Sequence, residues 1–177
     1  MTDVERLFGS YHATLVRYLT RRLGDRDWAE EVAQETFVRA LRQDTLKNER
    51  AWLFTVANNL VRDDARRTAR QRQQLTLLRD ELVAEAAMDE VVDDADDVVT
   101  MERARETALA RKAVDGLAER DRMALLLREE GLDYNEIAQA LDLSVSSVGT
   151  TLSRARRRLV EAYEELQLGA AGRTSNG

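Results

Sequence analysis

Hydroxyl and guanidinium side chains are concentrated in the segment from Leu132 to Leu159, LDYNEIAQALDLSVSSVGTTLSRARRRL. Arginine neutralises phosphates and donates several hydrogen bonds to them, and serine and threonine hydroxyls can bond to phosphates or to base edges. These residue types are typical of nucleic-acid recognition. The chemistry of this segment is therefore binding, provided that its local structure presents these side chains on one surface.

Two helices separated by a tight turn are predicted to position these side chains. Asp133 followed three residues later by Glu136 indicates a capped helix start. Asp142 marks the break, because aspartate tolerates the left-handed backbone conformation better than most residues. Ser144 is suited to cap the second helix. Apolar residues recur at helical spacing through both helices: Tyr134, Ile137, Ala138, Leu141, Val145, Val148, Leu152, Ala155 and Leu159.

A short helix, a tight turn and a second helix with polar and basic residues outside form the helix-turn-helix pattern. The pattern predicts that the second helix enters the major groove of duplex DNA. On the pattern alone, a helical hairpin on the surface of an all-helical domain remains the alternative.

The composition predicts an all-α protein. The chain has 177 residues, no proline and eight glycines, and helix-forming residues dominate it. Cysteine is absent, which excludes disulfides and thiolate metal sites, and His12 is the one histidine. We therefore expect no enzyme activity, no bound metal and no cofactor. No apolar run approaches membrane-spanning length, and the N-terminus lacks the apolar core of a signal peptide, so we expect a cytoplasmic protein.

A net charge of −6 conflicts with DNA binding until its distribution is considered, because affinity for duplex DNA comes mainly from cations on phosphates. Residues 80–102 contain ten acidic residues and no lysine or arginine, which leaves 27 basic and 23 acidic residues elsewhere, a net of +4. The sequence therefore predicts two mildly basic helical domains, an acidic linker that is partly helical and then flexible, and a disordered tail. Their predicted bounds are 1–74 and 103–168 for the domains, 75–102 for the linker and 169–177 for the tail.

Two helical segments of the first domain carry further polar patterns. Ala29–Leu41, AEEVAQETFVRAL, is typical of a core helix with a solvated acidic face. Ala51–Arg67, AWLFTVANNLVRDDARR, joins aromatic rings and amides to arginines. This combination suits single-stranded nucleic acid, because aromatic rings stack on bases, amides read base edges and cations hold the backbone. The alternative is that Trp52 and Phe54 belong to the core.

These two motifs, followed by LAERDRMALLLREEGLDYNEIAQALDLSVSSVGTTLSRARRRL, resemble the bacterial extracytoplasmic-function sigma factors of RNA polymerase. The resemblance covers residues 5–72 and 105–162. It implies that the two domains are sigma regions 2 and 4, which bind core polymerase and direct promoter-specific transcription initiation. Region 2 would open the −10 promoter element, and region 4 would read the −35 element through its helix-turn-helix.

The resemblance also implies sites in the first domain. The Ala29–Leu41 helix matches the family's surface for the clamp helices of the polymerase β′ subunit, with Glu31, Gln34, Glu35 and Arg39 as candidate contacts. The Ala51–Arg67 helix matches the part that opens the −10 element and captures a flipped base, which costs about a few kcal/mol of stacking. The candidate contacts to this strand are Asn58, Asn59, Arg62, Asp63, Arg66 and Arg67.

In the second domain, the helix-turn-helix matches the reader of the −35 element. Gly149 and Thr151 stand where many relatives have a basic residue. Because hydroxyls can contact any base, we expect weak direct readout and a larger share for backbone contacts and DNA shape. A glycine at position 149 would also let the helix approach DNA closely. The candidate contacts are Ser144, Ser146, Ser147, Thr150, Thr151, Arg154, Arg157 and Arg158.

The partners implied by the resemblance are core RNA polymerase, through its β′ clamp helices and β flap, promoter DNA, and an anti-sigma factor. The linker carboxylates could imitate a nucleic-acid backbone on a basic polymerase channel, or the linker could be a solvated spacer. A second hypothesis is a one-component regulator that binds duplex operator DNA, but it leaves the two motifs of the first domain unexplained. A small helical enzyme is the third hypothesis, and it lacks a catalytic constellation.

Overall fold

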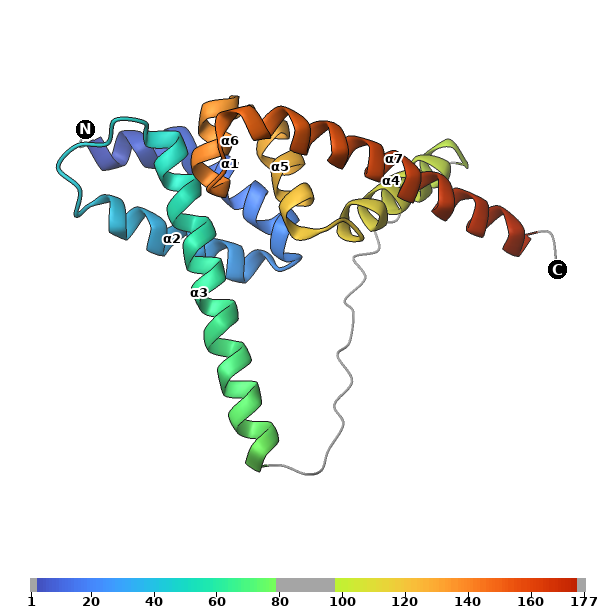
Figure 1. Ribbon diagram of the computed structural model, residues 1–177, viewed down its shortest axis with the longest axis horizontal. Coiled ribbons are helices and arrows are strands. Elements are labelled where there is room, and N and C mark those ends of the chain that lie inside the picture. The colour runs from blue at the N-terminus through green and yellow to red at the C-terminus, as the bar shows by residue number, and fades with distance from the viewer. Residues whose placement is uncertain (1–2, 79–97, 175–177) are drawn as a thin grey trace.

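The computed structural model describes residues 3–78 and 98–174, which form helices joined by short connections (Figure 1). Within these residues no strand occurs, and the prediction of an all-α protein is confirmed. Helices α1–α3 form the N-terminal half and helices α4–α7 the C-terminal half. Their bounds are α1 (Asp3–Leu23), α2 (Arg26–Ala40), α3 (Glu49–Leu78), α4 (Val98–Asp115), α5 (Glu119–Glu129), α6 (Tyr134–Leu141) and α7 (Val145–Thr174).

Local signals set the ends of the first helices. Gly24 ends α1 with a positive φ of 71°, a conformation that glycine adopts without steric cost. Asp25 caps α2, its carboxylate accepting a hydrogen bond from the N–H of Trp28 at 3.0 Å. Asn48 does the same for α3, accepting from the N–H of Ala51 at 3.1 Å. The three helices are thus separated by short connections that turn the chain back on itself.

The core of the N-terminal half lies where α1 and α3 pack on α2 and on each other. Tyr18 and Phe54 are fully buried, with ring centroids 5.2 Å apart in an edge-to-face arrangement. Phe54 is therefore a core residue, and Trp52 is half-buried against the same core. Of the two interpretations of the Ala51–Arg67 aromatics, the structure supports packing.

The C-terminal half is built around α7, against which α4, α5 and α6 pack. The largest side chains in its core are Leu127, Leu132, Ile137 and Leu152, none of which is measurably exposed. Burying a side chain of this size contributes about 1.5–3 kcal/mol, so these four contacts hold the helix-turn-helix in place.

The last helix is longer than the sequence predicts. The disordered tail predicted from residue 169 is wrong for residues 169–174, because α7 continues to Thr174. Its final turns, LGAAGRT, contain good helix formers and no proline, so each glycine costs the helix only about 1 kcal/mol relative to alanine. At the other boundary, α4 begins at Val98, inside the predicted linker. Residues 79–97, which hold most of that linker, lie outside the described residues.

The two halves pack against each other (Figure 1). Helix α6 lies against α3, and α5 contacts α1. Buried residues from both halves, including Phe54 of α3 and Ile137 of α6, belong to one hydrophobic cluster. Helix α3, which carries the predicted −10 contacts, therefore touches α6, the first helix of the helix-turn-helix.

Candidate nucleic-acid and polymerase interfaces

The helix-turn-helix is formed by α6, a left-handed turn residue and α7. The predicted capping box is confirmed: the Asp133 carboxylate accepts from the N–H of Glu136 at 2.9 Å, and the Glu136 carboxylate accepts from the N–H of Asp133 at 2.8 Å. Asp142 follows α6 with φ 54° and ψ 54°, as expected for an aspartate at the break. Leu143 then closes the turn, its N–H bonding to the carbonyl oxygen of Ala138 at 2.9 Å. The start of α7 is fixed relative to α6 by these bonds.

The outer face of α7 presents most of the side chains predicted to contact the −35 element. Thr151 differs from the others, because it is only 6% exposed and DNA could not reach it readily. Ser147 and Arg154 are half-buried. The exposed members of the set are Ser144, Ser146, Thr150, Arg157 and Arg158.

Packing leaves room for a side chain at Gly149. A Cβ atom built there would lie 3.6 Å from Cε2 of Tyr134, which is ordinary van der Waals contact. Packing therefore does not require a glycine at this half-buried position of α7.

A buried carboxylate holds two arginines of the recognition helix. Asp121 of α5 is 1% exposed and accepts hydrogen bonds from Nη2 of Arg154 at 2.7 Å and from Nη1 of Arg158 at 2.8 Å. These bonds, above all the one from Arg154, lower the pKa of the Asp121 carboxyl below its ordinary value, although burial opposes the shift. The side chains of Arg154 and Arg158 remain 39% and 49% exposed, so both arginines are accessible from solvent. The sequence does not predict this role of Asp121, which appears there as an acid in the first turn of α5, just before the apolar block.

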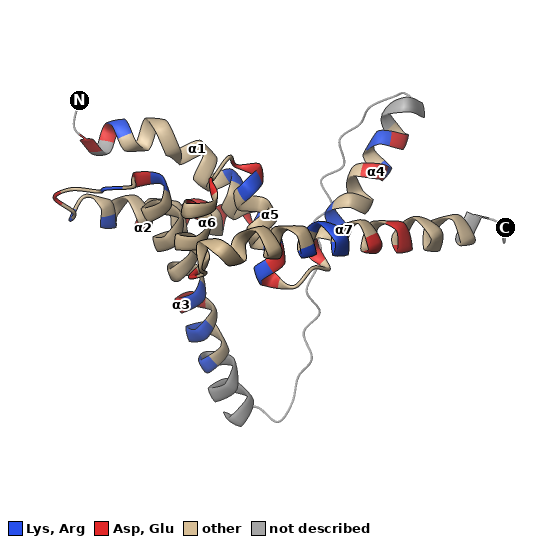
Figure 2. Ribbon diagram, turned by 45° about the horizontal axis from the view of Figure 1, so that its top comes forward, with Lys and Arg blue, Asp and Glu red and all other residues tan. Residues whose placement is uncertain are grey.

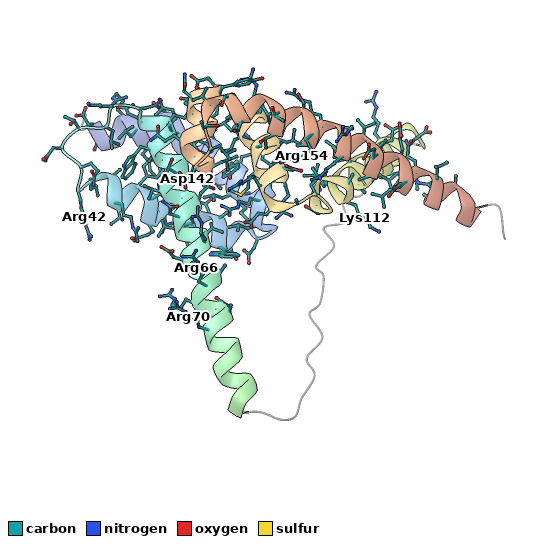
Figure 3. The ribbon with its side chains drawn as sticks, viewed as in Figure 1. Arg42, Arg66, Arg70, Lys112, Asp142 and Arg154 are labelled. Atoms are coloured by element: carbon teal, nitrogen blue, oxygen red, sulfur yellow. The ribbon has the colours of Figure 1, made fainter. Side chains whose placement is uncertain are left out.

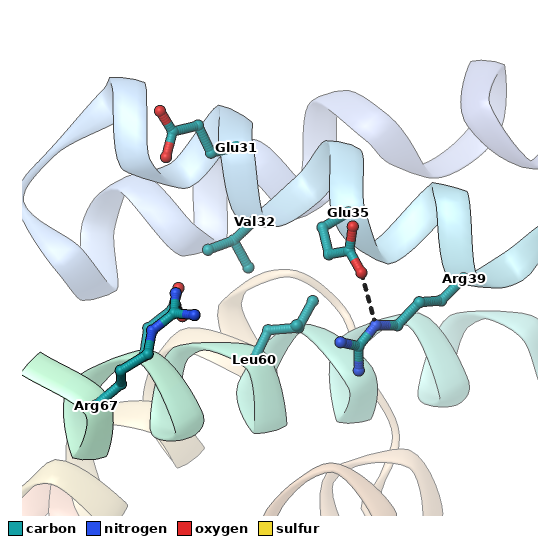
Figure 4. Close-up of a pocket in the computed structure, with 7 residues that line it drawn as sticks. Glu31, Val32, Glu35, Arg39, Leu60 and Arg67 are labelled. Carbon is teal, nitrogen blue, oxygen red and sulfur yellow. Dashed lines mark hydrogen bonds and ion pairs between the residues drawn. The ribbon is translucent and has the colours of Figure 1, made fainter.

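The surface between α2 and α3 contains a groove of about 340 Å³ (Figure 4). Three of the four predicted polymerase contacts line it: Glu31, Glu35 and Arg39. Glu35 accepts a hydrogen bond from Nε of Arg39 at 2.9 Å, so these two side chains are already paired across one turn of α2. Gln34 is exposed on the same helix. From α3, the groove is bordered by Leu60, Asp64 and Arg67.

The second part of α3 is a basic, exposed helix (Figure 2). Arg66 and Arg70 project from it beyond the packed part of the N-terminal half (Figure 3). Arg67 forms an exposed ion pair with Asp64, Nη2 to Oδ1 3.2 Å. The predicted −10 contacts that are exposed are Asn59, Arg62, Asp63, Arg66 and Arg67.

Asn58 is the exception among the predicted −10 contacts. It is 1% exposed, because α6 covers it. Its Oδ1 accepts from the hydroxyl of Tyr18 at 2.8 Å and from Nη1 of Arg22 at 2.7 Å, and its Nδ2 donates to the carbonyl oxygen of Ala140 at 3.2 Å. In this arrangement of the halves, Asn58 is therefore a structural residue that DNA cannot reach.

Comparison with known proteins agrees with this architecture. The family model for sigma-70 region 2 matches residues 7–71, and the model for sigma-70 region 4 matches residues 108–159. The ferric citrate uptake sigma factor FecI of Escherichia coli is 32% identical over 155 residues, which cover 85% of each chain. The ECF RNA polymerase sigma factor SigL of Mycobacterium tuberculosis is 46% identical over 71 residues, 37% of this chain and 40% of that one. The chain belongs to the extracytoplasmic-function sigma factors.

The fold of this sigma factor has also been seen in a solved structure. A co-crystal structure of the sigma factor RpoE with the anti-sigma factor NepR from Bartonella quintana superimposes with a TM-score of 0.68, at 21% identity, over 93% of this chain and 98% of that one. This sigma factor binds core RNA polymerase and directs promoter-specific transcription initiation, reading the −35 element by its helix-turn-helix and opening the −10 element. None of the helices described for it is both long and apolar enough to cross a membrane.

Proposed function

We propose that the promoter and polymerase contacts of this sigma factor are divided among three surfaces. The groove between α2 and α3, with Glu31, Glu35 and Arg39, binds the β′ clamp helices, and Gln34 extends that surface. The exposed arginines of α3 bind the opened −10 strand. The outer face of α7 binds the −35 duplex, while the β flap contacts the C-terminal half.

The observation that supports this division is that each of the three sets of residues is exposed on a different helix: α2, α3 or α7. The charged residues of α2 sit in a groove with hydrophobic Val32 and Leu60 beneath them, a combination suited to a helical protein partner. The arginines of α3 outnumber the two acids among them, Asp63 and Asp64, and together with the hydroxyls of α7 they line solvent-facing surfaces that suit contact with phosphates.

We also propose three properties that accompany this function. The sigma factor performs no catalysis of its own, because binding and strand capture account for its exposed polar residues. It acts in the cytoplasm, where RNA polymerase works. It is controlled by an anti-sigma factor, by analogy with RpoE, which is held by NepR in the co-crystal structure.

The function is tested by transcription in vitro with purified core polymerase, followed by mapping of start sites across the genome. We expect association with core polymerase and initiation at one class of promoter. Tight binding to duplex operator DNA without polymerase, together with no association with core, would instead establish the one-component regulator.

A further inference from the structure

The outer face of α7 carries one stripe of exposed side chains that continues well beyond the helix-turn-helix. Because an α-helix turns by about 100° per residue, positions spaced by three or four residues point within about 45° of one direction. The opposite side of the helix is packed, with Val148, Leu152 and Ala155 fully buried. The outer stripe consists of Ser146, Thr150, Ser153, Arg157, Glu161, Glu164 and Leu168, all of which are exposed.

The chemistry of the outer stripe changes along the helix. Its first part consists of hydroxyls and ends at the guanidinium of Arg157, and these groups suit contact with DNA. Glu161 and Glu164 follow, and Figure 2 shows basic positions of α7 succeeded by acidic ones toward its C-terminal end. At a rise of 1.5 Å per residue, the first part is about 17 Å long, and the two acids lie about 6 and 10 Å beyond Arg157. The face of α7 that is proposed to bind DNA therefore ends in negative charge.

These two acids contribute little to the fold. The Glu161 carboxylate lies 3.9 Å from Nε of Arg157, and the two side chains are 62% and 72% exposed. An ion pair this exposed adds little stability, because water and salt screen it and both side chains lose conformational freedom. Asp121 differs, because it is buried and its hydrogen bonds hold two arginines in place. Packing therefore does not explain the carboxylates of the outer stripe, whereas their position beside the proposed DNA contacts does.

Repulsion by these acids depends on how α7 lies on DNA. The major groove is about 12 Å wide and is bordered by phosphates. When α7 enters the groove with its first turns, the hydroxyls reach the base edges and the acids remain beyond the groove. When α7 lies flat across the phosphates, as in sequence-independent binding, Glu161 and Glu164 come within about 8 Å of them, the screening length of physiological salt. The acids therefore oppose the flat arrangement more than the inserted one.

We propose that Glu161 and Glu164 are specificity determinants of −35 recognition, which repel phosphates from the second part of the outer stripe. Specificity is a difference between affinities, and a repulsive element raises it by weakening the wrong complex. This inference rests on the proposed function, because it assumes that the outer face of α7 binds the −35 duplex. Each exposed charge changes affinity by about a factor of two, as exposed ion pairs do, so the two acids together lower sequence-independent affinity about fourfold.

The test compares promoter DNA with random-sequence DNA, using holoenzyme assembled from core polymerase and the full chain. Glu161→Gln combined with Glu164→Gln removes both charges and keeps the size of the side chains. Transcription from a mapped promoter is measured while a duplex of random sequence is added as competitor. We expect half-inhibition of the double variant at about two- to fourfold less competitor than the wild type requires, because sequence-independent binding is strengthened more than promoter binding.

Glu102→Gln combined with Glu106→Gln is the matched control. It removes the same charge from exposed positions of α4, a helix that does not cover the outer stripe, and it should leave half-inhibition at the wild-type concentration. Glu164→Gln alone separates the repulsion of phosphates from the release of Arg157, because the ion pair of Arg157 is with Glu161. This single variant should require about twofold less competitor than the wild type.

Three results would overturn this role of the two acids. The first is half-inhibition of the folded double variant at the wild-type competitor concentration, with circular dichroism showing that it is folded. The second is an equal shift in the α4 control, which would attribute the effect to net charge. The third is a shift matched by lost affinity for core polymerase, which would place the acids in that interface. Failure of the proposed function is distinguishable, since it appears in the wild type, as initiation that does not depend on the sequence of the −35 element.

Discussion

Asp121 of α5 accepts two hydrogen bonds from Arg154 of the recognition helix, from Nη2 at 2.7 Å and from Nε at 3.3 Å. The same carboxylate accepts a third from Arg158, one turn further along α7. A single buried acid therefore orients two cations on the helix that is proposed to face the −35 duplex. If both arginines contact DNA as proposed, less side-chain entropy would be lost on binding, because Asp121 already orients them.

Asp121→Asn should weaken both the fold and the binding of −35 DNA. The amide keeps one acceptor oxygen but loses the charge, so at least one arginine is released. We expect the free energy of unfolding to fall by about 1.5–3 kcal/mol, the range for hydrogen bonds to charged groups, as measured by urea denaturation. Glu161→Gln is the matched control: its exposed partner Arg157 lies 3.9 Å away, and its loss should change stability by less than about 0.5 kcal/mol. Equal effects of the two variants would contradict the orienting role of Asp121.

The same carboxylate should make stability depend on pH in the acid range. The pKa of Asp121 is lowered in the folded state by Arg154, and the pKa of Glu49 is lowered by its hydrogen bond to Arg6. A group whose pKa is lower in the folded state stabilises the protein above its unfolded pKa, and this stability is lost as pH falls through the folded pKa. We therefore expect the free energy of unfolding to be constant from neutral pH to about 5 and to decline below about 4.

Urea denaturation at several pH values measures this decline. It should be shallower in Asp121→Asn, because that variant removes one of the two titrating groups. If the free energy of unfolding declined identically with falling pH in the variant and the wild type, Asp121 would not contribute to the pH dependence.

The sequence predicts the elements of this protein better than their association. The capping box of Asp133 and Glu136 and the left-handed Asp142 are local features, so their outcome depends on a few neighbouring residues and is confirmed. The burial of Asn58 could not be predicted in the same way. Its acceptor, the carbonyl of Ala140, is 82 residues away, and no periodicity within either segment encodes that contact.

The same contrast between local features and contacts of distant residues holds for the site residues. Exposure of Arg62 and Arg66 follows from their position on the outer face of a helix whose inner face is apolar. The role of Asp121 does not, because an acid in the first turn of α5 is ordinarily a solvated residue that favours the helix dipole. Only the packing of α7 on α5 turns it into a buried partner of two arginines. The bounds of the linker and the assignment of individual DNA contacts stay predictions.

Gly149→Ala should separate the stability of the recognition helix from its function. The added methyl group meets only Cε2 of Tyr134 at 3.6 Å, so no clash opposes it. Alanine is favoured over glycine within a helix by about 1 kcal/mol, and the melting temperature should rise accordingly. Affinity for −35 duplex should fall, because the methyl group occupies space that the helix uses to approach DNA. Fluorescence anisotropy with a labelled −35 duplex measures the affinity, and unchanged binding would show that the close approach lies elsewhere on α7.

Arg66→Ala combined with Arg67→Ala should impair promoter opening more than it impairs polymerase binding. Both side chains are exposed on α3, and Arg66 projects away from the packed part of the molecule (Figure 3). Each arginine that neutralises a phosphate of single-stranded DNA contributes about 0.7 to the slope of log affinity against log salt. Loss of both contacts should therefore lower the slope for −10 strand binding by about 1.4, and permanganate reactivity of the −10 thymines should fall with it.

The control for this variant is Arg105→Ala combined with Arg111→Ala, which removes the same charge from exposed positions of α4. It should leave the salt slope and the permanganate footprint at wild-type values. Arg67 borders the groove that is proposed to bind polymerase, so affinity for core must be measured in both variants. If promoter opening falls only in proportion to the affinity for core polymerase, these arginines contribute to polymerase binding and not to strand separation. Opening lost at full core occupancy shows that these arginines hold the separated strand.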